Sequence, residues 1–280
     1  MQNFLIVLAC VIIGIALRSC RTLILRKLGA LTFLVASFLT IWLACGSIAA
    51  GLLGAALWFL LPWFNLLTRI RLMRLPVENR LKLRTPPSED HFPNASRLIH
   101  EIEKAEFDHV TDSGWDWAGM QQYFRFFWNP EAKAVAAVCL CEHDQVAFAF
   151  VTISARAPDG RTVHTTNYPF SPSLKHTPEA HWDHLPCERN CFESIYTDHQ
   201  RHLNKLKIPS KELLMPDPEE VLEQVESEMK RQIDHNLDCG LIKMTGDGHF
   251  QYSTKGLFFL WIQSMKDMIR LCLLYTSPSP

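Results

Sequence analysis

Long uninterrupted apolar stretches occupy the N-terminal quarter of the chain. From Leu28 to Thr68 no residue is charged, and a shorter apolar stretch runs from Phe4 to Leu17. As a single helix the longer run would extend about 60 Å, roughly twice the hydrocarbon core of a bilayer, so we expect it to fold back at Gly46-Ser47. The pattern predicts a transmembrane region over residues 1–68 with three helical spans, at about 2–18, 30–46 and 49–67.

Basic residues flank these stretches and indicate their orientation. One group lies between the first two stretches and another follows the third: Arg18, Arg21, Arg26 and Lys27, then Arg69, Arg71, Arg74, Arg80, Lys82 and Arg84. Because Lys and Arg near spans stay on the cytoplasmic side, three spans place both groups there and the N-terminus outside. We therefore expect a multi-pass protein of a bacterial-type cell inner membrane, with its C-terminal domain in the cytoplasm.

The first apolar stretch has two other interpretations, a cleaved signal peptide and a lipoprotein signal. A cleaved signal peptide would need a basic region before the apolar core, and none precedes Phe4. A lipoprotein box at Val7-Leu8-Ala9-Cys10 has too little apolar sequence before the cysteine. The three-span interpretation is favoured over both.

Shorter periodic patterns follow a basic, proline-containing linker at 69–90 and predict one cytoplasmic domain at 91–271. Helical spacing marks residues 94–107, 192–206, 217–238 and a last helix from about 254. Alternating patterns mark strands at 134–141, 146–154 and 161–167, with a hairpin at 241–253. The third strand is more polar and is expected at a sheet edge, whereas 168–186 is rich in proline and histidine and is expected to be a loop. The expected fold class is α+β: a three-helix transmembrane anchor, then a small antiparallel β-meander packed by helices.

An aromatic segment, Gly114 to Pro130, precedes the meander. Its side chains are expected mainly as core anchors, with an aromatic ligand cage as the less favoured alternative. The residues concerned are Trp115, Trp117, Tyr123, Phe126 and Phe127.

Charge argues against a nucleic-acid partner. Residues 85–280 hold 18 Lys and Arg against 28 Asp and Glu, which is the wrong sign for binding phosphates. The stretch 237–256 resembles the wing of winged-helix DNA-binding domains. However, the helix that would enter the groove, 217–238, has eight acidic residues and only Lys230 and Arg231 as basic ones. The expected partners are the lipid bilayer and a protein at the inner membrane face, with no nucleic acid.

Two helix ends carry further expectations. Asp217 is expected as the N-cap of the acidic helix, with Pro218 at its first position and Glu220 completing a capping box. The C-terminal helix, 256–271, is amphipathic and is expected either on the membrane surface or packed on the meander.

A His/Cys-rich segment, 176–202, is the sharpest candidate for chemistry. Zinc is held by thiolates and neutral imidazoles, and four residues here supply two of each: Cys187, Cys191, His199 and His202. His199 and His202 lie one helical turn apart and can face the same ion. Solvated histidines in a polar loop are the competing explanation.

The final nine residues, CLLYTSPSP at 272–280, resemble the translation of a sequencing-library transposon end. The resemblance implies read-through of adapter sequence rather than native protein, so the tail takes no part in the fold prediction.

Catalytic motifs are weak along the chain. The sequence has no Gly-x-Ser-x-Gly elbow, no phosphate-binding glycine loop and no dinucleotide fingerprint, and Asp198-His199 does not make a triad. The two longer spans contain no ionisable residue, which disfavours a transporter. The expected function is that of an integral membrane protein whose cytoplasmic domain is a tethered binding or scaffold module. The alternative is a zinc-dependent enzyme that uses the 176–202 segment.

Overall fold

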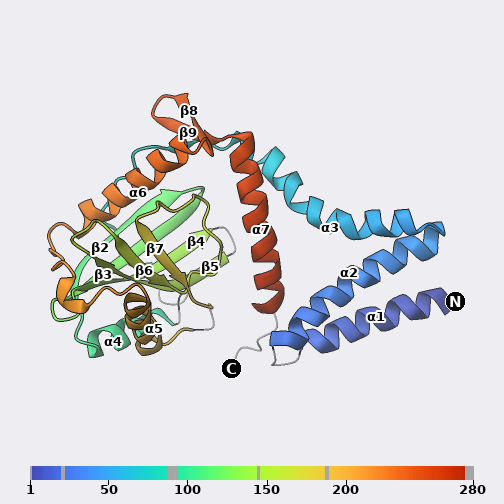
Figure 1. Cartoon of the computed structure of the whole chain (residues 1–280), viewed down its shortest axis with the longest axis horizontal. Coiled ribbons are helices and arrows are strands. Elements are labelled where there is room, and N and C mark those ends of the chain that lie inside the picture. Colours follow the sequence, from blue (N-terminus) through green and yellow to red (C-terminus); the bar gives the residue numbers. More distant parts are fainter. Residues whose placement is uncertain are drawn as a thin grey trace. The chain divides into compact units, whose positions relative to one another are not determined.

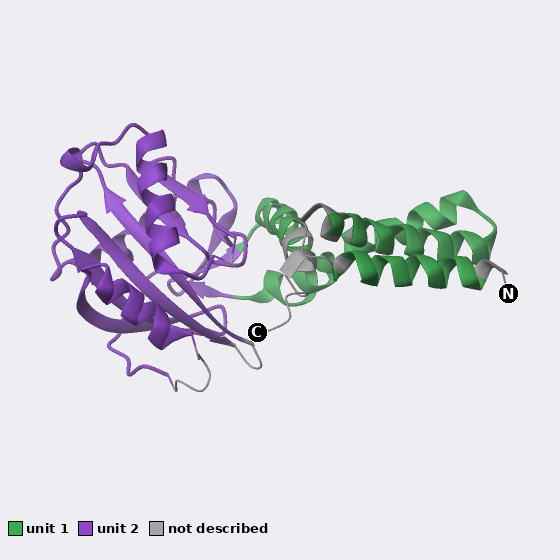
Figure 2. Cartoon of the chain, turned by 90° about the horizontal axis from the view of Figure 1, so that it is seen from below, with its two compact units in different colours: residues 1–73, 252–280 green, residues 74–251 purple. Residues whose placement is uncertain are grey.

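A computed structural model describes residues 2–19, 23–87, 92, 94–143, 146–186 and 189–274. The chain forms two compact units. One contains residues 1–73 together with 252–280, and the other contains residues 74–251 (Figure 2).

Three helices open the first unit: α1 (Gln2–Arg18), α2 (Leu23–Cys45) and α3 (Ile48–Thr68), followed by a 3-10 turn, η1 (Ile70–Leu72). The chain reverses between α2 and α3 at Gly46, where φ is +66°, as the sequence predicts. Glycines allow α3 to lie close to α2. A Cβ atom on Gly51 would lie 2.8 Å from Phe38, and one on Gly54 would meet Ile41.

Within the described residues, one helix is long and apolar enough to cross a bilayer, at Ile48–Leu72. The other two contain shorter apolar stretches, Phe4–Leu17 and Leu31–Cys45. The structure therefore supports one candidate span where the sequence predicts three.

The C-terminal helix α7 (Thr254–Leu274) belongs to the first unit and packs against α2 and α3. Trp63 of α3 meets Phe258 edge-on at 4.8 Å between ring centroids, and the Trp261 indole N–H donates to the Phe59 carbonyl at 2.7 Å. Pro62 also lies inside α3 and has no N–H to donate to the Trp58 carbonyl. Residues 275–280 of the predicted adapter tail lie outside the described residues.

The second unit is built on a six-stranded sheet of order β2-β3-β4-β5-β6-β7 (Figure 1). Its strands are β2 (Asp108–Trp117), β3 (Met120–Asn129), β4 (Ala134–His143), β5 (Val146–Arg156), β6 (Thr162–Thr166) and β7 (Ala180–His184). Neighbours are antiparallel except β6 and β7, which run parallel. A smaller sheet of order β1-β9-β8 joins β1 (Leu75–Pro76), β9 (His249–Tyr252) and β8 (Ile242–Gly246).

The α+β class is confirmed, but the main sheet is larger than the predicted meander and is mixed rather than antiparallel. The aromatic segment forms the β2–β3 hairpin, turning at Ala118 and Gly119 with φ of 55° and 80°. The predicted loop at 168–186 contains β7, which pairs with β6. That pairing makes β6 an internal, buried strand, so its prediction as an edge strand is wrong.

The described residues of the second unit also form the helices α4 (Ala95–Lys104), α5 (Phe192–Lys205) and α6 (Val221–Asp238) and the 3-10 helix η3 (Ser210–Glu212). Helix α6 begins at Val221 with Glu220 as N-cap, so the predicted capping box at Asp217 is wrong. Instead, the Asp217 carboxylate accepts from the Glu219 N–H in a turn before the helix. Gly240, with φ of +68°, ends the helix region as predicted.

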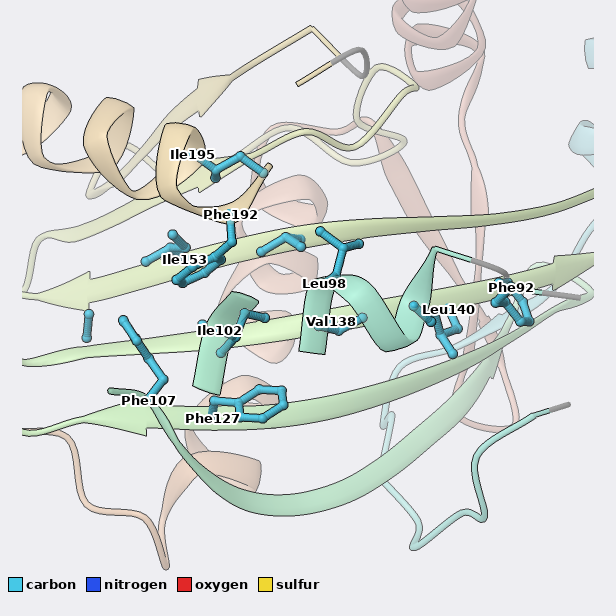
Figure 3. Packing of buried hydrophobic residues seen from close by; sticks show 14 of the residues in the cluster. Phe92, Leu98, Ile102, Phe107, Phe127, Val138, Leu140, Ile153, Phe192 and Ile195 are labelled. Carbon is cyan, nitrogen blue, oxygen red and sulfur yellow. The ribbon is translucent and has the colours of Figure 1, made fainter. Parts of the chain in front are cut away.

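One face of the sheet carries the main core. Helices α4 and α5 place Leu98, Ile102, Phe192 and Ile195 over strand residues of β3, β4 and β5, as Figure 3 shows. Phe107 meets Phe192 edge-on at 5.4 Å. Because side chains alternate along a strand, the other face of these strands is left for a different partner.

Candidate ligand-binding site

Between the second face of the sheet and helix α6 lies a cavity of about 310 Å³ that is partly open to solvent. Strand alternation sorts the residues. In β4, Ala136 and Val138 belong to the core face, whereas Ala137 and Cys139 line the cavity. Helix α6 contributes Val225, Glu228, Met229 and Gln232, which recur at helical spacing on one face. The cavity is therefore built within one unit, by strands, helix α6 and the loop at 168–176.

Aromatic side chains form most of one wall of the cavity. Trp115 of β2 meets Phe124 of β3 edge-on at 5.5 Å, and Phe150 of β5 meets Tyr168 at 4.8 Å. The Trp115 indole N–H is satisfied by the Gln122 side chain. The wall thus presents apolar ring surface, with the Trp115 N–H already paired.

Another part of the cavity wall is formed by three stacked rings, those of His164, Trp182 and His176. The Trp182 ring lies 4.2 Å from His164 and 4.6 Å from His176, each at an interplanar angle of 15°. Register explains the first contact, because His164 in β6 is paired directly with Trp182 in β7. Burial, with a smaller contribution from neighbouring histidines, lowers the pKa of His164 to about 3 and that of His176 to about 4. Both imidazoles are neutral at pH 7.

Among the described residues that line this cavity, Glu228 is the one that carries a charge. Its carboxylate lies 3.5 Å from the Arg156 Nε, 3.9 Å from the Arg231 guanidinium and 3.8 Å from the His164 Nε2. Burial raises the pKa of Glu228, while the two arginines oppose that effect. The carboxylate is thus held by arginines within reach of the cavity.

Helix α6 is fixed to the neighbouring loop by two amides. Asn236 is fully buried, accepts from the Lys175 N–H at 2.9 Å and donates to the Lys175 carbonyl at 2.8 Å. Gln232 donates to the Leu174 carbonyl at 3.2 Å. These bonds pair the backbone of the loop and hold it against the helix that covers the cavity.

A second cavity, of about 480 Å³, adjoins the first. The two have five lining residues in common: His164, His176, Trp182, Glu228 and Gln232. The second cavity is more polar and is otherwise lined by the last turns of α6, by residues 177–180 and by Gly160 and Thr162.

The predicted zinc ligands are found on and before α5. Cys191 is the exposed N-cap of the helix, and His199 lies eight residues further along, about 12 Å by helical rise. His199 is buried, and its Nδ1 lies 3.0 Å from the Thr165 hydroxyl. Burial lowers the pKa of His199 to about 3 and also lowers that of His202. The structure therefore separates Cys191 from the histidine pair.

Cys187 lies outside the described residues. Among the residues that are described, no three His, Cys, Asp or Glu side chains gather as a metal-ligand set. The four-residue zinc site stays a prediction.

Some of the residues that line the cavity belong to the aromatic segment singled out in the sequence. Of the predicted aromatic anchors, Tyr123 and Phe127 lie in the core, whereas Trp115, Trp117 and Phe126 line the cavity. Sequence reasoning missed His164, Trp182, Glu228 and Gln232. A signal was present in β6, where Thr162, His164 and Thr166 place polar groups on one face of a strand.

Comparisons with known proteins identify no relative of this chain. No protein-family model, curated protein or solved structure matches the chain.

Proposed function

We propose that this chain is a membrane-anchored binding protein whose 74–251 unit takes a small, largely apolar ligand into the cavity between its sheet and helix α6. The observation that carries the proposal is the cavity itself, an aromatic-walled space of about 310 Å³ on the face of the sheet opposite the core. Binding sites for small molecules are typically concave and apolar with a few placed polar groups, and this cavity has both features.

The anchor belongs to the same proposal. Helix α3 is a candidate span, and the charge pattern around α1, α2 and α3 favours three spans with the N-terminus outside and the 74–251 unit in the cytoplasm of a bacterial-type cell. Tethering would keep the cavity close to a bilayer, where apolar molecules concentrate. The sequence leaves a binding role and a scaffold role open, and the cavity is our reason for proposing ligand binding.

The proposal is tested with a substitution whose larger side chain fills the cavity. Ala137 lines it, and a phenylalanine there would occupy space that the folded chain leaves open, so Ala137→Phe should bind apolar probes at least tenfold more weakly without loss of stability. The matched control is Ala147→Phe, the same substitution at an exposed position of β5. The full chain in an uncharged detergent is titrated with N-phenyl-1-naphthylamine, and energy transfer from tryptophan is recorded.

Detergent micelles also take up the probe, and the control variant measures that background. Equal titration curves for the wild type, Ala137→Phe and Ala147→Phe would show that the probe reports only micelles, and would refute ligand binding in this cavity. Thermal unfolding of each variant checks that it is folded.

A further inference from the structure

The charged side chains around the two adjoining cavities are predominantly negative. Four acidic residues line them, Glu179, Glu228, Asp234 and Asp238, against one basic residue, Arg231. Arg231 lies 3.9 Å from Glu228, which also faces Arg156, so with Glu228 ionised these three groups leave one positive charge against the three negative charges of the other acids. The remaining acids, Glu179, Asp234 and Asp238, are exposed at the second cavity, and no ion pair between described residues includes them.

Backbone charge at this place has the same sign. The last turn of α6 lines the second cavity through His235 and Asp238. The C-terminal end of a helix carries partial negative charge, which favours cations nearby. Because burial keeps His164 and His176 neutral at pH 7, the stacked rings add no compensating positive charge.

We infer that the ligand is an amphiphilic amine, whose apolar body occupies the aromatic-walled cavity and whose positively charged group lies in the acidic cavity beside the end of α6. The inference rests on the proposed function, since it names the ligand class of that site. An apolar wall with an acidic mouth accepts such a molecule at both ends, whereas a carboxylate or phosphate at the mouth would be repelled.

The experiment compares three probes of one shape that differ in charge: 2-naphthylmethylamine, 2-naphthylmethanol and 2-naphthoate. Each displaces N-phenyl-1-naphthylamine from the full chain in uncharged detergent at pH 7, with Ala137→Phe as the micelle blank. We expect the amine to bind more tightly than the alcohol, and the alcohol more tightly than the carboxylate. The spread should narrow as salt rises, because the mouth charges are exposed.

A charge-removing variant locates the preference. The double variant Asp234→Asn/Asp238→Asn should weaken the amine roughly fivefold and leave the alcohol unchanged, as expected for two charges acting across about 8 Å of partly aqueous space. The matched control, Glu219→Gln/Glu223→Gln, removes two negative charges from the other end of the acidic segment and should leave all three probes unchanged.

The outcomes separate the two proposals. If the alcohol binds but the amine has no advantage over it, or if Asp234→Asn/Asp238→Asn leaves the advantage intact, the ligand class is wrong while the cavity stands. If the alcohol does not displace the dye at all, the proposed function fails, and this inference fails with it.

Discussion

His164 shows at the scale of one residue how the site depends on burial. The ring is stacked on Trp182, and its Nε2 lies 3.1 Å from the Thr162 hydroxyl. Burial lowers its pKa to about 3 in the folded chain, against about 6.5 when unfolded. The unfolded chain therefore binds the proton first as pH falls.

This difference predicts a pH dependence of stability. As pH falls from 6.5 to 4, the free energy of unfolding should decrease by about 1.4 kcal/mol per pH unit because of His164. The substitution His164→Gln should remove that part of the pH dependence. The raised pKa of Glu228 acts in the opposite direction, so the effect of His164 is read from the difference between the variant and the wild type. Urea unfolding at several pH values measures it.

The control for this prediction is His100→Gln, the same substitution at an exposed position of α4. It accounts for the loss of an imidazole from the surface. Parallel pH slopes for the wild type and His164→Gln would show that His164 titrates in the fold as it does in the unfolded chain.

At the scale of elements, the attachment of α6 to the 168–179 loop closes the cavity. Asn236→Leu removes the partners of the Lys175 N–H and carbonyl in two partly buried hydrogen bonds, and a polar group left unpaired away from water costs about 1–3 kcal/mol. We expect a loss of roughly 2–4 kcal/mol in the free energy of unfolding, faster hydrogen exchange at 174–177 and weaker probe binding.

Asn204→Leu is the comparison, because Asn204 is exposed on α5. It should change none of the three properties. Hydrogen exchange at 174–177 that is as slow in Asn236→Leu as in the wild type would show that the loop is held by other contacts.

Sequence patterns predicted the elements better than their pairing. Strands β4 and β5 and helices α5 and α6 follow periodic apolar residues, so local pattern was sufficient to place them. Strand β7 was missed because His181, Asp183 and His184 give it no apolar alternation. It is a strand because its backbone pairs with β6, a contact between segments that the sequence alone does not bring together.

The candidate site was predictable only in part, for a related reason. Val225 and Met229 stand out as an apolar helical stripe, but Glu228 on the same face looks like an ordinary solvated residue. Its role depends on Arg156 of β5 and His164 of β6 lying beside it, which follows from tertiary packing. Such pairs are recognised only once the fold is known.

At the scale of the whole molecule, the proposed topology makes a prediction about native cysteines. Cys45 lies at the α2–α3 turn, which three spans place outside the cell, and Cys191 lies in the unit placed in the cytoplasm. With all other cysteines replaced by serine, we expect a membrane-impermeant maleimide to label Cys45 in intact cells. Cys191 should be labelled only after the membrane is permeabilised.

These two single-cysteine variants are controls for each other. Labelling of Cys191 in intact cells would place the 74–251 unit outside and contradict the orientation. Release of the full chain from membranes by alkaline carbonate would contradict membrane anchoring altogether.

The central claim, that the sheet and α6 enclose a ligand site, is tested most directly by counting bound molecules. Native mass spectrometry of the full chain, released from detergent after incubation with 2-naphthylmethylamine, should show one bound molecule in the wild type and in Ala147→Phe, and none in Ala137→Phe. The same mass distribution in all three proteins would contradict the claim.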